Sequence, residues 1–354
     1  MEPQDNLPAE REPAAPCPDS TTPMPANWRD SPWVCAAVAI VATGALGAAL
    51  MALSISRYGD YGFTLFCLSP GISAFGAVLL HEWARPDAGS RALTSVKTVV
   101  GLLAAVFSLL CLVSLHVEGL ICVAMALPVA LVMALIGAVL GGLVVQLTGR
   151  PRPLPMLLTV LVLYPTAQEA EVRLGQPAAP RLVTTQMEVN APPTRVWAAL
   201  RRPMRFPAAT GWFRAGVVYP VSTALATDAA GGHRLVCQYS QGVARLPVVA
   251  WQPGRQLTFA VPPASMPAPM HEISPYPQQL HAPHLHGYFQ VDSGTFRLRA
   301  LPGGRTLLEA RTVYRHAIAP RAYWQLWSDH LLDAMHRRVL LTLKAQAETA
   351  SRHD

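Results

Sequence analysis

The chain has 354 residues, of which 51% are hydrophobic and only 14% are charged, and its net charge is +7. Soluble chains carry about a quarter charged residues. The deficit is confined to the stretch between Trp33 and Gln146, and ordinary charge returns from Glu169 onward. This division excludes a protein that is soluble throughout, and it predicts a membrane part followed by a soluble part.

Composition also narrows the partners and the chemistry. The basic residues form no run of the kind that neutralises nucleic-acid phosphates, so we expect no nucleic-acid partner. The six cysteines show no CxxC or other paired spacing, which predicts no disulfide framework. The sequence has no phosphate loop, dinucleotide fingerprint or nucleophile motif, and we therefore expect no cofactor.

The first segment, residues 1–30, is rich in Pro, Ala and acidic residues and has almost no large apolar side chains. Such a composition cannot bury enough apolar surface to fold, so we predict a disordered tail. The segment also lacks the apolar core of a signal peptide.

Residues 31–167 are predicted to form a transmembrane helical domain that contacts the lipid bilayer. A bilayer core of about 30 Å needs about 20 apolar helical residues. Four segments meet this requirement, at residues 33–55, 61–80, 99–115 and 119–146. The fourth contains Gly137, Gly141 and Gly142. Small residues at this spacing let neighbouring helices approach closely.

The orientation of these spans follows from the basic residues in the loops. Arg57 stands alone on one side of the membrane. The other side has Arg29, Arg85, Arg91, Lys97, Arg150 and Arg152. This asymmetry predicts that the N-terminus lies in the cytoplasm.

A shorter apolar segment, residues 153–166, follows the four spans. At ~1.5 Å per residue it reaches about 21 Å, which is short for a bilayer. Arginines precede it and Glu169 and Glu171 follow it, which favours a fifth span and a periplasmic C-terminal domain. An interfacial helix is the alternative, so the bundle has four or five helices.

The remainder has the pattern of a water-soluble domain. Residues 168–180 are predicted to be a linker. A strand at residues 182–190 and a short helix opened by Pro192 and Pro193 follow, and a long helix runs from Pro320 to about Thr349. Strands are expected between them at residues 216–226, 233–241, 244–251, 255–261, 286–291, 294–301 and 306–316.

This order of elements predicts an α+β domain over residues 181–350, in which a curved antiparallel sheet wraps the last helix. The apolar face of that helix is expected to hold Tyr323, Trp327, Leu331, Ala334 and Leu341. The space between sheet and helix is then either a packed core or a ligand cavity.

Two parts of this domain resemble the SRPBCC or START-like superfamily, which includes polyketide cyclases and lipid-transfer START domains. Residues 183–197, which end VNAPPTRVW, resemble its opening strand and helix. The hairpin at residues 303–314, GGRTLLEARTVY, and the terminal helix resemble its last elements. The resemblance covers residues 181–348, and it implies a helix-grip fold with the capacity to hold a hydrophobic ligand.

The whole chain resembles bacterial membrane proteins that join such a domain to an N-terminal helical bundle. Three pieces carry this resemblance: EGLIC at residues 118–122, MHEISPY at 270–276 and YWQLWSD at 323–329. It implies a multi-pass protein of the inner (cytoplasmic) membrane. Asp333 stands where the group has a histidine, which argues against a two-histidine site on the last helix.

An apolar ligand between the sheet and the last helix would contact aromatic side chains and a few polar anchors. The sequence does not separate aromatic residues of the core from those of a lining. The candidate ligand-binding residues are Trp212, Tyr239, Trp251, His271, Glu272, Tyr288, Glu309, Tyr314, Trp327, His330 and His336.

Some of these candidates have a competing structural interpretation. His330 and Asp333 form either an acid–base pair that faces the cavity or, as we favour, part of the surface, where Asp333 pairs with Arg337. The carboxylate of Glu118, at a membrane boundary, is interpreted as interfacial.

Glu309 is either a buried anchor on the inner face of the sheet or, as we favour, the partner of Arg297 or Arg299 in a cross-strand ion pair. A two-residue turn at the glycines 303 and 304 would set Leu298 opposite Glu309. Only a shift of one residue brings an arginine there.

The loop at residues 266–287 is rich in histidine and proline. His281, His284 and His286, with Glu272, have a spacing that suits a divalent metal. Metal sites need rigid ligands, however, and the prolines favour a polar rim at a cavity mouth or a partner-binding loop. We therefore expect no metal.

Three functions stay open. The favoured one is a membrane-anchored binding module for a lipid or another hydrophobic small molecule. The second is an interaction or assembly domain with a packed core and a membrane-protein partner. The third is an enzyme of cyclase, dehydratase or hydrolase type, which requires a cavity-facing pair such as His330 with Asp333 or His271 with Glu272.

Overall fold

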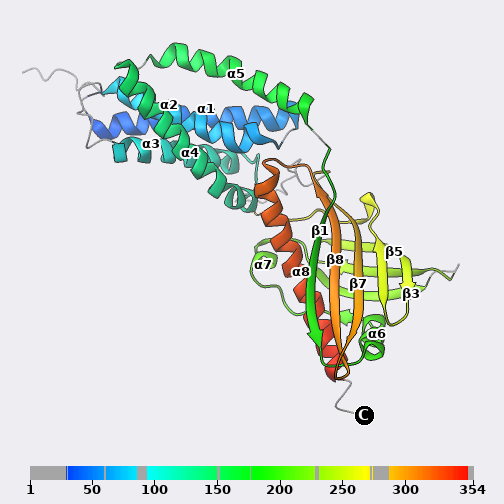
Figure 1. The fold of residues 1–354 in the computed structure, drawn as a ribbon. Helices are drawn as coiled ribbons and strands as arrows, with labels where there is room; N and C mark the ends of the chain where they lie inside the picture. The colour runs from blue at the N-terminus through cyan, green and yellow to red at the C-terminus, as the bar shows by residue number, and fades with distance from the viewer. Residues whose placement is uncertain are drawn as a thin grey trace, which may run out of the picture.

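The computed structural model describes residues 29, 31–59, 61–85, 94–149, 152–175, 177–227, 231–271, 273 and 287–349. A helical bundle and an α+β domain are joined end to end (Figure 1). The predicted tail, apart from Arg29, lies outside the described residues.

The bundle contains α1 (Pro32–Leu53), η2 (Ser54–Tyr58), η3 (Thr64–Leu68), α2 (Ser69–Ala84), α3 (Thr94–Ser114), α4 (Leu120–Thr148) and α5 (Pro153–Leu174). The short elements η2 and η3 are π-helical turns that extend α1 and precede α2. In the described part of the chain, four helices are long and apolar enough to cross a membrane: Pro32–Tyr58, Thr64–Ala84, Ser95–Ser114 and Leu120–Thr148. They coincide with the four predicted spans.

Helix α5 is longer than predicted, because residues 168–174 of the expected linker continue it. Gln168 is fully buried, and its Oε1 accepts a hydrogen bond from Ser54 Oγ at 2.7 Å. The carboxylate of Glu171 accepts the backbone N–H groups of Phe63 and Thr64, at the start of η3. A carboxylate is stabilised at a helix N-terminus, so these polar residues hold α5 against the bundle. The linker prediction is therefore wrong for this half of the segment.

Helices α2 and α4 approach most closely where glycine removes the side chains. A Cβ on Gly137 would lie 2.1 Å from the carbonyl oxygen of Gly71, and one on Gly141 would lie 3.1 Å from that of Phe75. A Cβ on Gly142 would have nothing within 4 Å. The predicted close approach is confirmed for Gly137 and Gly141, whereas Gly142 takes no part in it.

The domain consists of an antiparallel sheet of eight strands that curls around helix α8 (Arg321–Thr349), and the predicted helix-grip fold is confirmed (Figure 1). The strand order is β1-β8-β7-β6-β5-β4-β3-β2. The bounds are β1 Arg181–Val189, β2 Met204–Arg205, β3 Pro220–Thr227, β4 His233–Tyr239, β5 Gly242–Gln252, β6 Gln256–Ala260, β7 Phe289–Leu301 and β8 Arg305–His316. The short helices are α6 Pro193–Arg201, α7 Trp212–Ala215 and η4 Pro263–Ser265.

The hairpin of β7 and β8 turns at residues 302–304, so that Leu301 pairs with Arg305. This register brings Arg297 opposite Glu309, as the favoured interpretation of Glu309 required. The two strands predicted at residues 286–291 and 294–301 are one strand, β7, which has a register shift between Val291 and Ser293. A β-bulge of this kind disturbs the alternation of inward and outward side chains, which explains why one strand resembled two.

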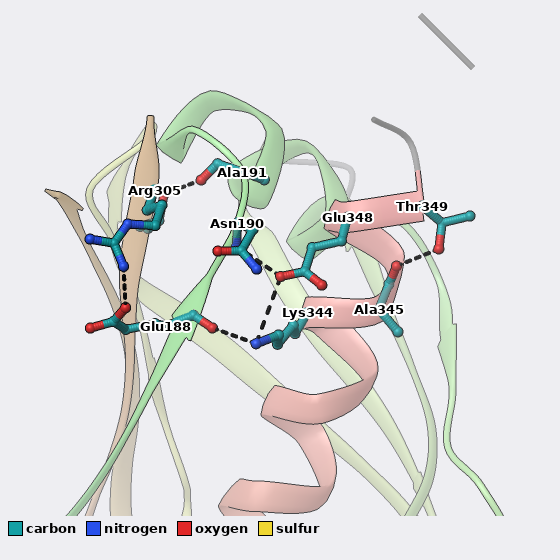
Figure 2. A network of polar contacts seen from close by, with 9 residues as sticks. Glu188, Asn190, Ala191, Arg305, Lys344, Ala345, Glu348 and Thr349 are labelled. Carbon is teal, nitrogen blue, oxygen red and sulfur yellow. Dashed lines mark hydrogen bonds and ion pairs between the residues drawn. The ribbon is translucent and has the colours of Figure 1, made fainter. Parts of the chain in front are cut away.

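The end of the grip that lies far from the bundle is closed by a packed core. Side chains of the sheet, α6 and α8 meet there, and the most buried are Val189, Val196, Leu257, Leu308, Leu340 and Leu343. Polar contacts surround this core (Figure 2). Lys344 Nζ donates to the Glu188 carbonyl at 2.9 Å, and Glu348 Oε1 accepts the Asn190 N–H at 2.8 Å. Arg305 and the Glu188 carboxylate form an ion pair at 2.7 Å.

The buried face of α8 is rotated from the predicted one. It is formed along most of the helix by Leu332, His336, Leu340, Leu343 and Ala347. Leu341, which was predicted to lie on the apolar face, is 57% exposed, so this prediction is wrong. The polar His336 interrupts the buried stripe. The prediction followed apolar residues only, and it therefore identified a neighbouring face of the helix.

Replacement of Gly137 tests the contact between α2 and α4. Gly137→Ala sets a methyl group against the backbone of Gly71, and the helices must separate. We expect the free energy of unfolding to fall by about 1–3 kcal/mol. Thermal unfolding of the full chain in detergent, followed by tryptophan fluorescence, measures the change. Gly142→Ala is the matched control, and we expect it to be neutral or stabilising by about 0.5–1 kcal/mol. Equal destabilisation of both variants would contradict the helix contact.

Candidate functional site

A cavity of about 440 Å³ lies where the bundle meets the mouth of the grip. This volume falls within the ~300–1,000 Å³ that is usual for small-molecule sites. The bundle contributes apolar side chains that include Met51, Leu65, Leu109, Leu112, Ala126 and Ala130. The domain contributes Val218, Val261, Val291, Leu331, Leu332 and Met335. The cavity thus extends the predicted space between sheet and helix into the bundle.

Backbone hydrogen bonds fix the domain to the bundle around this cavity. The N–H of Leu120, at the start of α4, donates to the carbonyl of Ile273 at 3.0 Å. The N–H of Ala319 donates to the carbonyl of Tyr61 at 2.9 Å. The first N–H groups of a helix have no partner within it, so the loop of the domain supplies an acceptor that α4 itself lacks.

Aromatic and sulfur contacts complete the junction. The rings of Phe66 and Trp324 lie 4.9 Å apart between centroids, in a tilted arrangement. The hydroxyl of Tyr323 donates to the carbonyl of Met125. Cys122 Sγ lies 3.8 Å from Met270 Sδ. The described parts of the three segments that carry the whole-chain resemblance, at 118–122, 270–276 and 323–329, therefore meet at this junction.

The polar side chains of the mainly apolar wall include Gln290 and Ser328, and three others that are buried: Glu118, His316 and Trp324. Glu118 is 7% exposed, and its Oε1 accepts a hydrogen bond from Tyr61 Oη at 2.6 Å. His316 and Trp324 are each 6% exposed. Among the described residues, the indole Nε1 of Trp324 has no hydrogen-bond partner, and neither ring nitrogen of His316 makes a hydrogen bond of normal geometry. All three line the cavity, and the prediction that Glu118 lies at the membrane boundary stays a prediction.

The environment of His316 determines its charge. The residue ends β8 on the inner face of the sheet, where its ring stacks on that of Tyr314 at 6.2 Å. Burial, followed by the positive charge of Arg321, lowers the pKa of His316. The imidazole is therefore neutral at neutral pH, with one nitrogen that donates and one that accepts.

Four of the predicted aromatic residues lie in or beside the cavity. Tyr239 and Trp327 line it. The ring of Trp212 packs edge-on against Trp327 at 5.2 Å, and that of Tyr288 against Tyr61 at 5.1 Å. These last two candidates support the wall from behind.

Trp251 and Tyr314 lie away from the cavity. Trp251 packs against Trp197 at 5.0 Å, at the edge of the far core. Tyr314 is fully buried, and its hydroxyl donates to Asp329 at 2.7 Å. Arg181 forms an ion pair with the same carboxylate at 2.6 Å, which ties β1 to α8.

The polar candidates are mostly satisfied by protein groups. Glu309 faces the outer side of the sheet, where it accepts a hydrogen bond from Gln186 at 2.8 Å and pairs with Arg311 at 2.9 Å. The inner-face interpretation is therefore wrong, and the ion pair forms with Arg311, on the same strand. Asp333 pairs with Arg337 at 2.7 Å, as predicted.

The histidine candidates are dispersed. His330 and His271 are exposed, and no hydrogen bond or ion pair joins His330 to Asp333 in the part that the structure describes. Glu272 and the histidines at 281, 284 and 286 lie outside the described residues. Among residues that are described, no group of three or more His, Cys, Asp or Glu could hold a metal ion.

No protein-family model and no curated protein matches this chain. Its C-terminal half is similar to solved structures, and at their low sequence identity the likeness concerns the fold alone. Protein MLL2253 from Mesorhizobium loti is 18% identical, with 48% of this chain and 98% of that chain covered and a TM-score of 0.29. A norcoclaurine synthase from Thalictrum flavum is 7% identical, with 49% and 98% covered and a TM-score of 0.30. The Zhui aromatase/cyclase from Streptomyces sp. R1128 is 15% identical, with 48% and 94% covered and a TM-score of 0.24.

His336 is predicted to make the stability of the domain depend on pH. Its Nδ1 lies 2.9 Å from Thr185 Oγ1 and its Nε2 lies 2.7 Å from Thr312 Oγ1. Burial lowers the pKa of His336 to about 4, against the opposing effect of Asp333. The unfolded chain therefore takes up this proton first. The contribution of neutral His336 to the free energy of unfolding is complete above pH ~6.5. It is lost as the pH falls to about 4, and the loss is up to about 3 kcal/mol.

Thermal unfolding between pH 4 and pH 7 measures this dependence. His336→Gln has no titrating ring, and we expect its unfolding temperature to change less with pH than that of the wild type. His330→Gln, on the exposed side of α8, is the matched control and keeps the wild-type slope. If the unfolding temperature of His336→Gln changed with pH as much as that of the wild type, the attribution of the pH dependence to His336 would be contradicted.

Proposed function

We propose that this protein is a membrane-anchored binding module for a lipid or another apolar small molecule, which occupies the cavity between bundle and grip. The observation that carries the proposal is the composition of the wall. Helices that are long and apolar enough to cross a membrane form one side, and the inner face of the grip forms the other. Each buried methylene contributes about 0.8 kcal/mol relative to water, so such a wall favours an apolar occupant.

The two alternative functions have less support. An interaction domain with a packed core would have no cavity at the mouth of the grip. An enzyme would need an acid–base pair in the cavity, and the candidate His330 is exposed. Of the other candidate pair, His271 is also exposed.

We also propose that α5 crosses the membrane. Leu120 begins α4 at the junction and Thr148 ends it at the opposite end of the bundle. Pro153 begins α5 near that opposite end, and Glu171 reaches back to the junction (Figure 1). If α1 to α4 span the bilayer, α5 therefore passes from one side to the other. With the predicted orientation of the loops, the N-terminus is cytoplasmic and the grip domain is periplasmic.

Reporter fusions in a bacterial host test this topology. Alkaline phosphatase, which is active only in the periplasm, is expected to be active when fused after Asp354 and inactive when fused before Met1. A fusion to a chain truncated after Gly149, which lacks α5, is the matched control and is expected to be inactive. Activity of the truncated fusion with inactivity of the full-length C-terminal fusion would contradict the proposal.

A substitution that fills the cavity tests the binding function. Leu331→Trp adds bulk to a lining position of α8. We expect native mass spectrometry of the full chain, with lipid extraction, to find an apolar molecule on the wild type and at least about tenfold weaker retention in the variant, equivalent to ~1.4 kcal/mol.

Leu341→Trp, at an exposed position of the same helix, is the matched control and is expected to retain the molecule. Comparable unfolding temperatures exclude misfolding as the cause. A wild type that carries and takes up no apolar molecule would refute the proposed function.

A further inference from the structure

The cavity wall contains polar groups that select among apolar ligands, and the inference drawn from them rests on the proposed binding function. A lipid that enters from a bilayer has already left water, so burial of its chain discriminates weakly between ligands. Polar contacts must therefore supply the selectivity. We infer that the ligand is a neutral amphiphile whose hydroxyl group lies at the junction, among Trp324, His316 and Glu118.

The indole of Trp324 supplies a directed donor. Its Nε1–H can only donate, and it is buried in the wall without an acceptor in the part of the chain that the structure describes. Buried donors in native proteins are almost always paired, so an unsatisfied one requires an explanation. An oxygen atom of a ligand in the cavity would satisfy it.

His316 adds a second group, because its ring nitrogens make no hydrogen bond of normal geometry to any residue that the structure describes. Its ring is held at the end of β8 by stacking on Tyr314, and it lines the same cavity as Trp324. As a neutral imidazole it offers one donor and one acceptor. A hydroxyl group has the same dual capacity and complements it.

The charge of the wall argues against an anionic headgroup. Glu118 contributes a carboxylate, whose Oε1 is already engaged by Tyr61. No Lys or Arg belongs to the lining in the described part of the chain. A fatty-acid carboxylate would therefore be buried beside a carboxylate and without a cation from these residues, which is unfavourable. A hydroxyl group can instead donate to Glu118 or His316 and accept from Trp324.

A cationic headgroup fits this arrangement less well than a hydroxyl group. An ammonium group could pair with Glu118, but it has no lone pair for the N–H of Trp324. The amine is therefore the third member of the test series.

The test compares three single-chain probes of equal length, hexadecanol, hexadecanoic acid and hexadecylamine, with hexadecane as the apolar reference. The full chain is reconstituted in phosphatidylcholine nanodiscs, each probe is added at the same mole fraction, and native mass spectrometry measures its occupancy. We expect hexadecanol to bind at least about tenfold more tightly than each of the other three.

Variants attribute this preference to the named groups. Trp324→Phe keeps an aromatic ring and removes the N–H, and His316→Phe removes both nitrogens. Each is expected to weaken the binding of hexadecanol until its affinity lies within about threefold of that of hexadecane, because the hydroxyl oxygen loses its partner. Glu118→Gln removes the charge and is expected to raise the binding of hexadecanoic acid by about tenfold. Trp33→Phe, at a residue 83% exposed at the far end of the bundle, is the control and keeps the wild-type preference.

The outcomes separate this inference from the function on which it rests. Equal binding of hexadecane and hexadecanol, or tighter binding of the acid or the amine, would overturn the inference and leave the binding function standing. A preference that survives both Trp324→Phe and His316→Phe would overturn the assignment to these residues. Failure of all four probes to bind would refute both proposals.

Discussion

Backbone hydrogen bonds join the domain to the bundle, and the cavity exists because of this docking. The carbonyl of Ile273 accepts the first N–H of α4, and the carbonyl of Tyr61 accepts the N–H of Ala319. The rings of Phe66 and Trp324 pack against each other across the same junction. Without the bundle, the mouth of the grip would expose apolar side chains to water. Each part therefore completes the apolar interior of the other.

Most of the fold could be predicted from local patterns in the sequence. Long apolar segments and period-two alternation depend on neighbouring residues only, and they located the four long apolar helices and the strands of the grip. The errors concern contacts between distant segments. Gln168 and Glu171 have the composition of a linker, yet their partners Ser54 and Thr64 make them part of α5. The buried stripe of α8 includes His336, which an apolar repeat cannot detect.

The site was only partly predictable for a related reason. Tyr239 lines the cavity, whereas Trp251 packs at the edge of the far core. Both are aromatic residues on strands, and composition alone does not distinguish them. His316 was missed although a signal existed, since it shares strand parity with the buried Tyr314 and so faces the same side. The burial of Glu118 in the cavity wall was not predicted, because the sequence does not reveal that the domain contacts the start of α4 beside it.

The closed far end of the grip has a consequence for exchange. The core around Leu308 and Leu340, with the contacts of Lys344 and Glu348, closes the far end (Figure 2). If a molecule binds as proposed, it would exchange at the junction beside the bundle. For a molecule dissolved in the bilayer, the quantity that sets occupancy is then its mole fraction among the surrounding lipids and not its concentration in water. The bilayer would in that case act as the solvent of the ligand, and occupancy would follow membrane composition. A ligand with negligible solubility in water would then reach its binding equilibrium as readily as a water-soluble one.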